Sequence, residues 1–235
     1  MSRLTKRQRA QECLRRLEPL YGELTTGLNF TSPLELLMAT ILSAQCTDER
    51  VNLVTPTLFG RFSTAQEYAS ADPTEIEQII QSCGFFRNKT KSIQGAARVL
   101  CERFDGQVPR TMVQLLTLPG VARKTANVVL AHAFNKNEGI AVDTHVRRLS
   151  TRLRLSSEIE PTRIESDLMK LVPRERWGET SDLLIWHGRR ICSARSPQCA
   201  ICVLADICPS AFRVERPNQS RSGTIVLAER EIKTH

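Results

Sequence analysis

Four cysteines near the end of the chain constrain its fold more than any other feature of the sequence. Cys192, Cys199, Cys202 and Cys208 lie within a stretch of 17 residues and are separated by six, two and five residues. In a reducing compartment, such a group is typical of a metal site rather than of disulfides. Structural zinc sites with four cysteines usually combine two units of closely spaced ligands, and only one such unit, Cys199–Cys202, occurs here. The stretch therefore predicts a loop around an inorganic centre, with zinc as the alternative.

The rest of the sequence is typical of an all-α protein. Ser32-Pro33 and Asp72-Pro73 are signatures of helix starts, and no sustained apolar–polar alternation predicts a strand. Apolar spacing predicts helices over 10–21, 33–45, 74–83, 89–104, 123–134, 144–153, 161–171 and 179–190. The remaining cysteines are expected to be small buried apolar side chains: Cys13, Cys46, Cys83 and Cys101.

Two stretches mark the organisation of the chain. The segment 135–139 (NKNEG) is the most polar, turn-rich break in the middle of the sequence, and we interpret it as a domain boundary. Residues 212–235 lose helical periodicity and predict a flexible tail.

The charge of the chain favours a polyanionic partner. There are 33 Lys and Arg residues against 25 Asp and Glu, a net charge of +8, and each phosphate neutralised by a protein releases counterions. Charge alone is equally consistent with a well-solvated basic surface. The aromatic residues (8 Phe, 2 Trp, 2 Tyr) are too few for a stacking platform that binds single strands, so duplex is the favoured nucleic acid. No apolar run approaches the roughly 20 residues of a membrane span, and no secretory signal follows the basic N-terminus, so we expect a soluble cytoplasmic protein.

Residues 118–126 (LPGVARKTA) predict a tight turn that leads into a helix. Gly120 permits a positive φ and a close backbone approach. The start of the following helix offers free N–H groups and the positive end of its dipole to an anion. A DNA phosphate fits such a site without any base being read. Taken by itself, the turn is also consistent with a plain joint between two helices.

Two residues near helix starts carry reactive groups. Lys124 lies in the first turn after the hairpin, where the dipole and an expected partial burial favour a neutral, nucleophilic amine. Alone, a lysine at this place is more typical of a charge contact to phosphate. Asp143 follows an apolar triplet and is expected to be the N-cap of the next helix. The arginines that follow form a face that is either solvated or tracks phosphates: Arg147, Arg148, Arg152 and Arg154.

Together these stretches resemble the endonuclease III family of helix-hairpin-helix DNA glycosylases. The resemblance covers roughly residues 3 to 210 and rests on LPGVARKTA (118–126), VDTH (142–145), SAQCTD (43–48) and the 6-2-5 spacing of the cysteines. The sequence departs from the family at Ala122, where the hairpin usually has glycine. Alanine would cost roughly 1 kcal/mol at a positive φ. It is harmless if the residue already lies at the start of the right-handed helix, which we expect.

The resemblance implies two helical domains with an active site in the cleft between them. One is a six-helix domain with the helix-hairpin-helix motif (27–136), and the other holds a [4Fe-4S] cluster (1–26 and 137–211). Lys124 matches the Schiff-base nucleophile, Asp143 the catalytic carboxylate, and the four cysteines the cluster ligands. The implied DNA-binding residues are Gln45, Phe85, Gly120, Ala122, Arg123 and His145. Gln45 would fill the space of a flipped nucleotide and Phe85 would be an apolar wedge, although a buried polar group and a core aromatic are alternatives.

The implied function is base-excision repair. The chain would be a bifunctional glycosylase that removes oxidised pyrimidines from duplex DNA and cleaves the abasic site by β-elimination, as a monomer bound to DNA in the cytoplasm. One alternative is a monofunctional mismatch glycosylase, such as the adenine-specific relative, which lacks the lysine and has an added C-terminal domain. Another is a non-catalytic iron–sulfur DNA-binding module, which would not need both Lys124 and Asp143.

Overall fold

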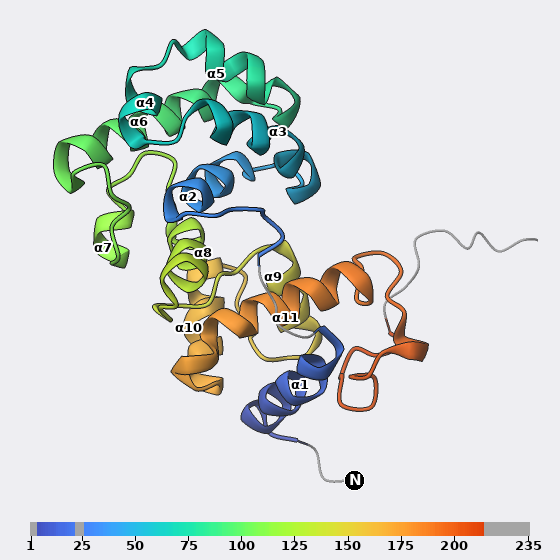
Figure 1. The fold of residues 1–235 in the computed structure, drawn as a ribbon. Helices are drawn as coiled ribbons and strands as arrows, with labels where there is room; N and C mark the ends of the chain where they lie inside the picture. Colours follow the sequence, from blue (N-terminus) through green and yellow to red (C-terminus); the bar gives the residue numbers. More distant parts are fainter. Residues whose placement is uncertain (1–3, 22–25, 214–235) are drawn as a thin grey trace, which may run out of the picture.

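The protein is a helical molecule whose described residues, 4–21 and 26–213 in a computed structural model, contain no strand (Figure 1). The helices are α1 (Lys6–Tyr21), α2 (Pro33–Leu42), α3 (Asp48–Arg61), α4 (Ala65–Ser70), α5 (Pro73–Ile80), α6 (Phe86–Phe104), α7 (Met112–Leu115), α8 (Arg123–Phe134), α9 (Thr144–Arg152), α10 (Pro161–Leu171) and α11 (Trp177–Arg190). Short 3₁₀ turns follow α5 and precede α11, and a third lies in the cysteine loop. The predicted all-α class is confirmed. Most of the predicted tail, 214–235, lies outside the described residues.

Local capping explains helix boundaries that apolar spacing did not predict. The helices α3 and α4 were not expected, yet the Thr47 hydroxyl accepts the Arg50 amide at 3.2 Å, and Thr64 forms a capping box with Glu67. The helix α2 ends at Leu42 rather than continuing to residue 45, because Gln45 adopts a left-handed conformation with φ 52°. Two of the cysteines outside the loop are less buried than expected. Cys13 and Cys83 are buried, whereas Cys46 and Cys101 are only partly buried.

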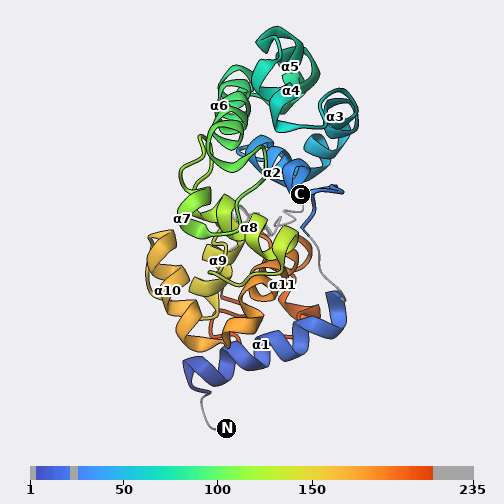
Figure 2. The ribbon, with the colours of Figure 1, turned by 60° about the vertical axis from the view of Figure 1, so that its left-hand side comes forward.

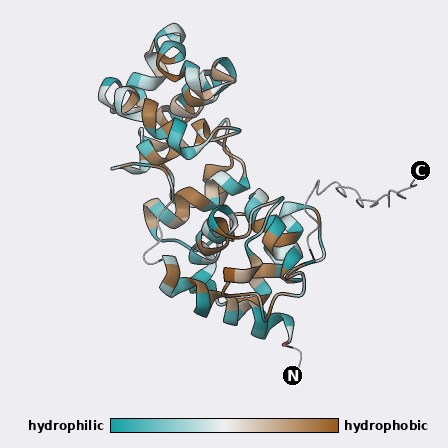
Figure 3. Ribbon diagram, turned by 90° about the vertical axis from the view of Figure 1, so that its right-hand side faces the viewer, coloured by the Kyte–Doolittle hydropathy of each residue, from teal (hydrophilic) through white to brown (hydrophobic). Residues whose placement is uncertain are grey.

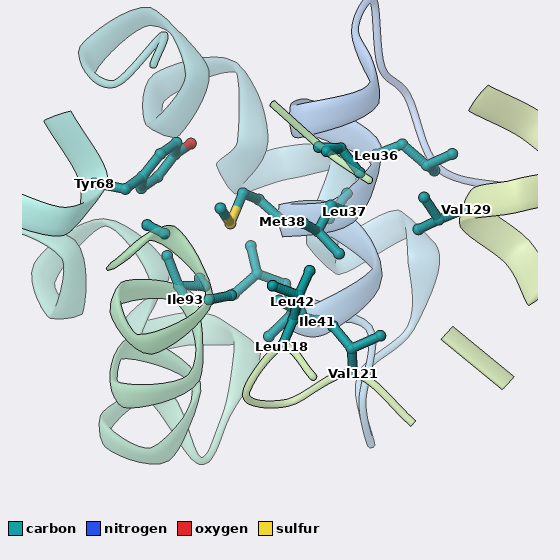
Figure 4. Close-up of a cluster of buried hydrophobic side chains, with 14 of the residues drawn as sticks. Leu36, Leu37, Met38, Ile41, Leu42, Tyr68, Ile93, Leu118, Val121 and Val129 are labelled. Carbon is teal, nitrogen blue, oxygen red and sulfur yellow. The ribbon is translucent and has the colours of Figure 1, made fainter. Parts of the chain in front are cut away.

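A first hydrophobic core is built around α2. Leu36, Leu37, Met38 and Leu42 of this helix are completely buried, and α2 packs against α3, α6 and α8. Figure 4 shows these side chains meeting others from α4, α6, α8 and the hairpin turn. Complete burial of such a side chain contributes roughly 1.5–3 kcal/mol. We call the part of the chain from residue 26 to 134 that surrounds this core the hairpin lobe.

A second hydrophobic core combines the first helix with the last three. Leu14 and Leu17 of α1 pack with Val146 and Leu149 of α9 and with apolar residues of α10 and α11. Figure 2 shows α1 lying across the end of the molecule formed by α9, α10 and α11. We call residues 4–21 and 139–213, which surround this core, the cysteine lobe. Along the ribbon of Figure 3, apolar residues alternate with polar ones on the helices of both lobes, as amphipathic packing requires.

Ion pairs connect the two lobes. Arg123 Nε of α8 donates to Glu165 Oε2 of α10 at 2.6 Å, and Asn127 Nδ2 donates to Glu165 Oε1 at 2.8 Å. On another side, Arg189 Nη2 of α11 donates to Asp48 Oδ2, at the start of α3, at 2.8 Å. These contacts fix the starts of α8 and α3 relative to the cysteine lobe.

Candidate functional site

The hairpin turn before α8 requires glycine at position 120 for two reasons. The Val121 amide donates to the Leu118 carbonyl at 3.1 Å, and Gly120 has φ 77°, as expected for a turn with Pro and Gly at its centre. A Cβ at Gly120 would also lie only 2.7 Å from Ser92 Cβ of α6. The turn therefore packs closely on α6 and delivers the chain directly into the start of α8.

The backbone geometry at the start of α8 makes it a candidate anion site. Ala122 is the N-cap with φ −90° and ψ 171°, so alanine is unstrained here, although it occupies an extended cap rather than the helix itself. Alanine has no side-chain oxygen to accept an amide, and the N–H groups of the first turn find no acceptor within the described part of the chain. They are available to an external anion, and the dipole of α8 favours negative charge at the same place.

Lys124 projects from the first turn of α8 into solvent. The expectation of partial burial is wrong, because Lys124 follows an exposed turn formed by Pro119 and Gly120 and its own side chain is exposed. Its amine lies in solvent near the start of α8. The amine is accessible to a bound substrate.

Asp143 caps α9 with one of its two carboxylate oxygens. Oδ1 accepts the backbone amides of His145 and Val146, each at 2.8 Å, and these bonds leave Oδ2 uninvolved. The side chain is half-buried. Asp143 therefore caps the helix as expected. The cap orients the carboxylate, and Oδ2 takes no part in these hydrogen bonds.

The two helix starts belong to different lobes of the molecule. The helix α8 contributes Ala126, Val129 and Leu130 to the first core, whereas α9 contributes to the second. Both α8 and α9 pack against α11. The segment between them is held by a hydrogen bond from the Ala141 amide to Ser181 Oγ of α11 at 2.8 Å. The helices that carry Lys124 and Asp143 therefore belong to different lobes and share α11 as a packing partner.

Two of the predicted DNA-binding side chains are engaged inside the protein. The Arg123 guanidinium pairs with the buried Glu165, so only its backbone amide remains at the anion site. The ring Nδ1 of His145 lies 3.0 Å from Arg148 Nη2, and burial lowers the pKa of this histidine below its usual value. Sequence analysis missed the role of Glu165, because its partners lie on another helix.

Gln45 and Phe85 lie in strained turns on the hairpin lobe. Both have left-handed backbone conformations, with φ 52° and 47°, which are uncommon for residues other than glycine. Gln45 is exposed, and 67% of Phe85 is exposed, so neither is the buried group that the alternative interpretations assumed. Lys89 Nζ of α6 donates to the carbonyl of Cys83, two residues before Phe85, at 2.8 Å. Strain that is maintained by such contacts is typical of functional positions.

The four predicted ligands line one pocket of the cysteine lobe. Cys192, Cys199, Cys202 and Cys208 face it together with apolar residues such as Leu149 and Leu204. Within the described ranges, no three Cys, His, Asp or Glu side chains converge closely enough for a single metal ion. Zinc would hold its sulfur ligands at about 2.3 Å. A thiolate-only set spread around a pocket instead fits a centre larger than one ion, as an iron–sulfur cluster is.

Protein groups also surround the sulfur atoms. Arg152 Nη1 donates to Cys192 Sγ at 3.1 Å, and the Leu204 amide donates to Cys202 Sγ at 3.4 Å. Burial raises the pKa of the Cys202 and Cys208 thiols, so a metal centre must displace their protons on binding.

The arginine face of α9 is divided between the lobe interior and solvent. Arg152 donates to the carbonyls of Ser193 and Ala194, and Arg148 donates to those of Gly188 and Cys192. These two side chains hold the cysteine loop, so neither of the two interpretations of the whole face is correct. Arg147 and Arg154 are exposed.

Comparison with known families defines the class of this chain. The family described as HhH-GPD superfamily base excision DNA repair protein matches residues 38–174. The family described as the iron-sulfur binding domain of endonuclease III matches residues 192–208. The chain is thus a helix-hairpin-helix base-excision repair protein with an iron–sulfur domain.

The similarity to individual proteins is more specific. The chain is 58% identical over 207 residues to endonuclease III of Synechocystis, which covers 88% of this chain and 94% of that protein. It is 39% identical over 204 residues to endonuclease III of Escherichia coli, which covers 87% and 96%. It belongs to the endonuclease III family, whose members are DNA glycosylases and AP lyases of base-excision repair with a [4Fe-4S] cluster. The predicted family, activity and cofactor are confirmed.

Solved structures agree with this assignment. A trapped endonuclease III–DNA covalent intermediate and a non-covalent endonuclease III–DNA complex each match with a TM-score of 0.85 and 42% identity, over 89% of this chain and 98% of the matched chain. A thermostable thymine-DNA glycosylase has the same fold, with a TM-score of 0.78 at 22% identity. None of the helices within 4–21 and 26–213 is long and apolar enough to cross a membrane.

Proposed function

We propose that Lys124 and Asp143 are the catalytic pair of this glycosylase and that its substrates are damaged bases, chiefly oxidised pyrimidines, and abasic sites in duplex DNA. One observation carries the proposal. Two helices from different lobes, which both pack against α11, present at their starts an accessible amine and a carboxylate oxygen that is not used for capping. A related endonuclease III was solved as a trapped covalent intermediate with DNA, which is the kind of adduct that a nucleophilic amine forms.

Phosphate binding at the hairpin would place the DNA without reading its sequence. The free amides after Ala122 suit a phosphate oxygen, and Arg147 and Arg154 are exposed cations on the cysteine lobe. The damaged nucleotide would leave the base stack, which costs least where damage has weakened stacking. Exposed Phe85 would then wedge the duplex and Gln45 would fill the vacated space.

The chemistry follows from the two side chains. Lys124 Nζ, as a neutral amine, attacks C1′ of the sugar, and the bond between C1′ and the base breaks with the electron pair leaving on the base. Asp143 Oδ2 stabilises the positive charge that develops on the sugar and accepts a proton from the attacking amine. The sugar ring opens to an imine with Lys124. The imine acidifies the C2′ proton, and its removal expels the 3′ phosphate by β-elimination.

The two cores support a division into two domains. We propose a helix-hairpin-helix domain over 27–136 and an iron–sulfur domain over 1–26 and 137–211, with 212–235 as a tail and the active site in the cleft between the domains. Residues 28–130 supply the first core, and residues 10–17 with 140–204 supply the second.

The cluster belongs to the second domain, where Cys192, Cys199, Cys202 and Cys208 would hold it. When bound, it supplies four iron–thiolate bonds that close the loop. The loop itself is tied to α9 through Arg152, so the cluster domain supports the helix that Asp143 caps. We further propose that the protein acts as a monomer on cytoplasmic DNA.

A second candidate is a monofunctional mismatch glycosylase, which is less consistent with the site. Such an enzyme needs no amine nucleophile, whereas Lys124 is exposed at the start of α8. A non-catalytic DNA-binding module would not need Lys124 and Asp143 together.

Borohydride trapping distinguishes these functions. The holo-protein is incubated with duplexes that carry an oxidised pyrimidine, an abasic site, a mismatched adenine or no lesion, and the imine is reduced. We expect covalent complexes with the first two duplexes and, in peptide mass spectra, a sugar adduct on Lys124. Base release without an adduct would indicate the monofunctional alternative, and an adduct on another amine would refute the site.

A further inference from the structure

We infer that His187 is a positioning residue for the iron–sulfur cluster: its Nε2–H donates to the sulfur of Cys202 and raises the reduction potential of the cluster, while the Tyr21 hydroxyl fixes the ring in the required tautomer. This inference goes beyond the glycosylase chemistry and depends only on Cys202 being a cluster ligand.

His187 lies between the first helix and the cysteine loop. It is only 2% exposed, and its ring nitrogens have one partner each. The Tyr21 hydroxyl oxygen, at the end of α1, lies 2.9 Å from Nδ1, and Cys202 Sγ lies 3.4 Å from Nε2. The Tyr21 and His187 rings meet edge-on, with centroids 6.2 Å apart and planes at 64°.

The direction of both hydrogen bonds follows from the state of the cysteine. A cluster-bound cysteine is a thiolate and can only accept, so Nε2 must carry a hydrogen. The other ring nitrogen, Nδ1, faces the Tyr21 hydroxyl, and no carboxylate hydrogen-bonds to the ring within the described residues. With the hydrogen on Nε2, Nδ1 is an acceptor, and the Tyr21 hydroxyl donates to it. The other tautomer would direct a lone pair at the thiolate.

The backbone of His187 reinforces this geometry. Its carbonyl accepts the amides of Ile191 and Cys192 at 3.0 and 2.8 Å, at the point where α11 ends and the loop begins. One residue thus contacts the first cysteine of the loop through its main chain and the third through its ring. Its orientation is fixed by α11, by the loop and by α1.

A hydrogen bond to a ligand sulfur changes the relative stability of the two redox states. Reduction places more negative charge on the thiolates, so a donor stabilises the reduced state more than the oxidised one. The pocket is lined mainly by apolar groups, and in such surroundings the effect of a single donor is larger than in water. Loss of the His187 donor should therefore make the potential more negative and the cluster easier to oxidise.

Voltammetry of holo-protein variants tests the inference. His187→Phe keeps an aromatic ring without the donor, and we expect a more negative potential and a several-fold faster loss of visible absorption in air. Tyr21→Phe keeps the imidazole but removes the group that selects its tautomer, so it should shift the potential in the same direction by a smaller amount. His187→Gln, whose amide can donate, should restore part of the shift.

Tyr68→Phe is the matched control. Tyr68 is buried in the hairpin lobe, and its hydroxyl has no hydrogen-bond partner within the described residues, so its removal should leave the potential unchanged. An unchanged potential in His187→Phe with a full complement of iron and sulfide overturns the inference. If His187→Phe does not retain its cluster, Tyr21→Phe decides, and an unshifted potential there overturns it as well.

Discussion

The starts of α8 and α9 differ in how they satisfy their first backbone amides. At α9, the Asp143 carboxylate accepts the amides of His145 and Val146. At α8, Ala122 cannot accept any, and the first-turn amides find no acceptor within the described part of the protein. The amides at the start of α9 are satisfied within the protein, whereas those at the start of α8 are available to an anion.

This difference explains why each end can carry its own reactive group. Lys124 extends from the α8 start, where the free amides and the dipole favour an anion. At α9, Asp143 uses one carboxylate oxygen for the cap and keeps the other outside it. The two ends therefore present an exposed amine and a carboxylate oxygen, and the predictions below test each end separately.

The largest effect is expected at the α8 end. Lys124→Ala should reduce both the borohydride-trapped complex and strand cleavage at abasic sites to background, because no amine remains to form the imine. Gel analysis of trapped and cleaved duplex measures both. Lys170→Ala, which removes an exposed lysine of α10, is the control and should retain activity. Trapping that persists in Lys124→Ala would assign the nucleophile to another amine.

The second effect concerns the charge at α9. Asp143→Asn keeps a side-chain oxygen for the cap but loses the negative charge, so base excision should fall by roughly 10²–10⁴-fold with little change in melting temperature. Asp143→Ala should show the same loss and also lower the free energy of unfolding by about 1 kcal/mol. Single-turnover excision and thermal unfolding separate the two roles. If Asp143→Asn melts early and retains its excision rate, capping is the whole function of this residue.

A third prediction concerns the side chain next to Lys124. Arg123→Met should lower the free energy of unfolding by about 1–3 kcal/mol, because it leaves the buried Glu165 without its cation. The salt dependence of binding to undamaged duplex should not change, since the guanidinium is already paired within the protein. Arg147→Met, on an exposed part of α9, should instead make that dependence less steep. A reduced slope in Arg123→Met would show that this arginine contacts phosphate.

The smallest effect is expected when the start of α8 is given a side-chain cap, as the start of α9 has. Ala122→Ser introduces a capping hydroxyl at α8, which should raise the free energy of unfolding by about 1 kcal/mol. The hydroxyl competes for the amides that a phosphate would use, so affinity for duplex should fall a few-fold. Ala122→Gly removes the methyl group without adding a cap and serves as the control. Tighter DNA binding by Ala122→Ser would contradict the anion site.

Local signals made much of this architecture predictable. Ser32-Pro33 and Asp72-Pro73 predicted the starts of α2 and α5, because Pro and a capping side chain act on their own helix. The turn at Gly120, the cap at Asp143 and the cysteine loop were predictable because each depends on residues that are close together in the sequence. The capping box of Thr64 and Glu67 was also visible in the sequence and would have revealed α4.

Features that depend on distant contacts were not predictable. The exposure of Lys124 depends on how the hairpin lies on α6, and the pairing of Arg123 with Glu165 joins helices 42 residues apart in sequence. Arg148 and Arg152 look like a surface face until α9 is packed beside the cysteine loop. The left-handed conformations of Gln45 and Phe85 are likewise imposed by tertiary structure, since neither residue type favours them.

The second core has a consequence for biosynthesis. It needs Leu14 and Leu17 from the first helix together with residues that follow position 139. On a ribosome, the helices from α2 to α8 emerge as a continuous segment and can collapse while α1 waits without its partners. The residues after position 139 emerge last, so α1 can bury its apolar face only when synthesis is nearly complete. A chain whose synthesis stops before that point should therefore leave the apolar face of α1 exposed, which makes it a substrate for chaperones and proteases.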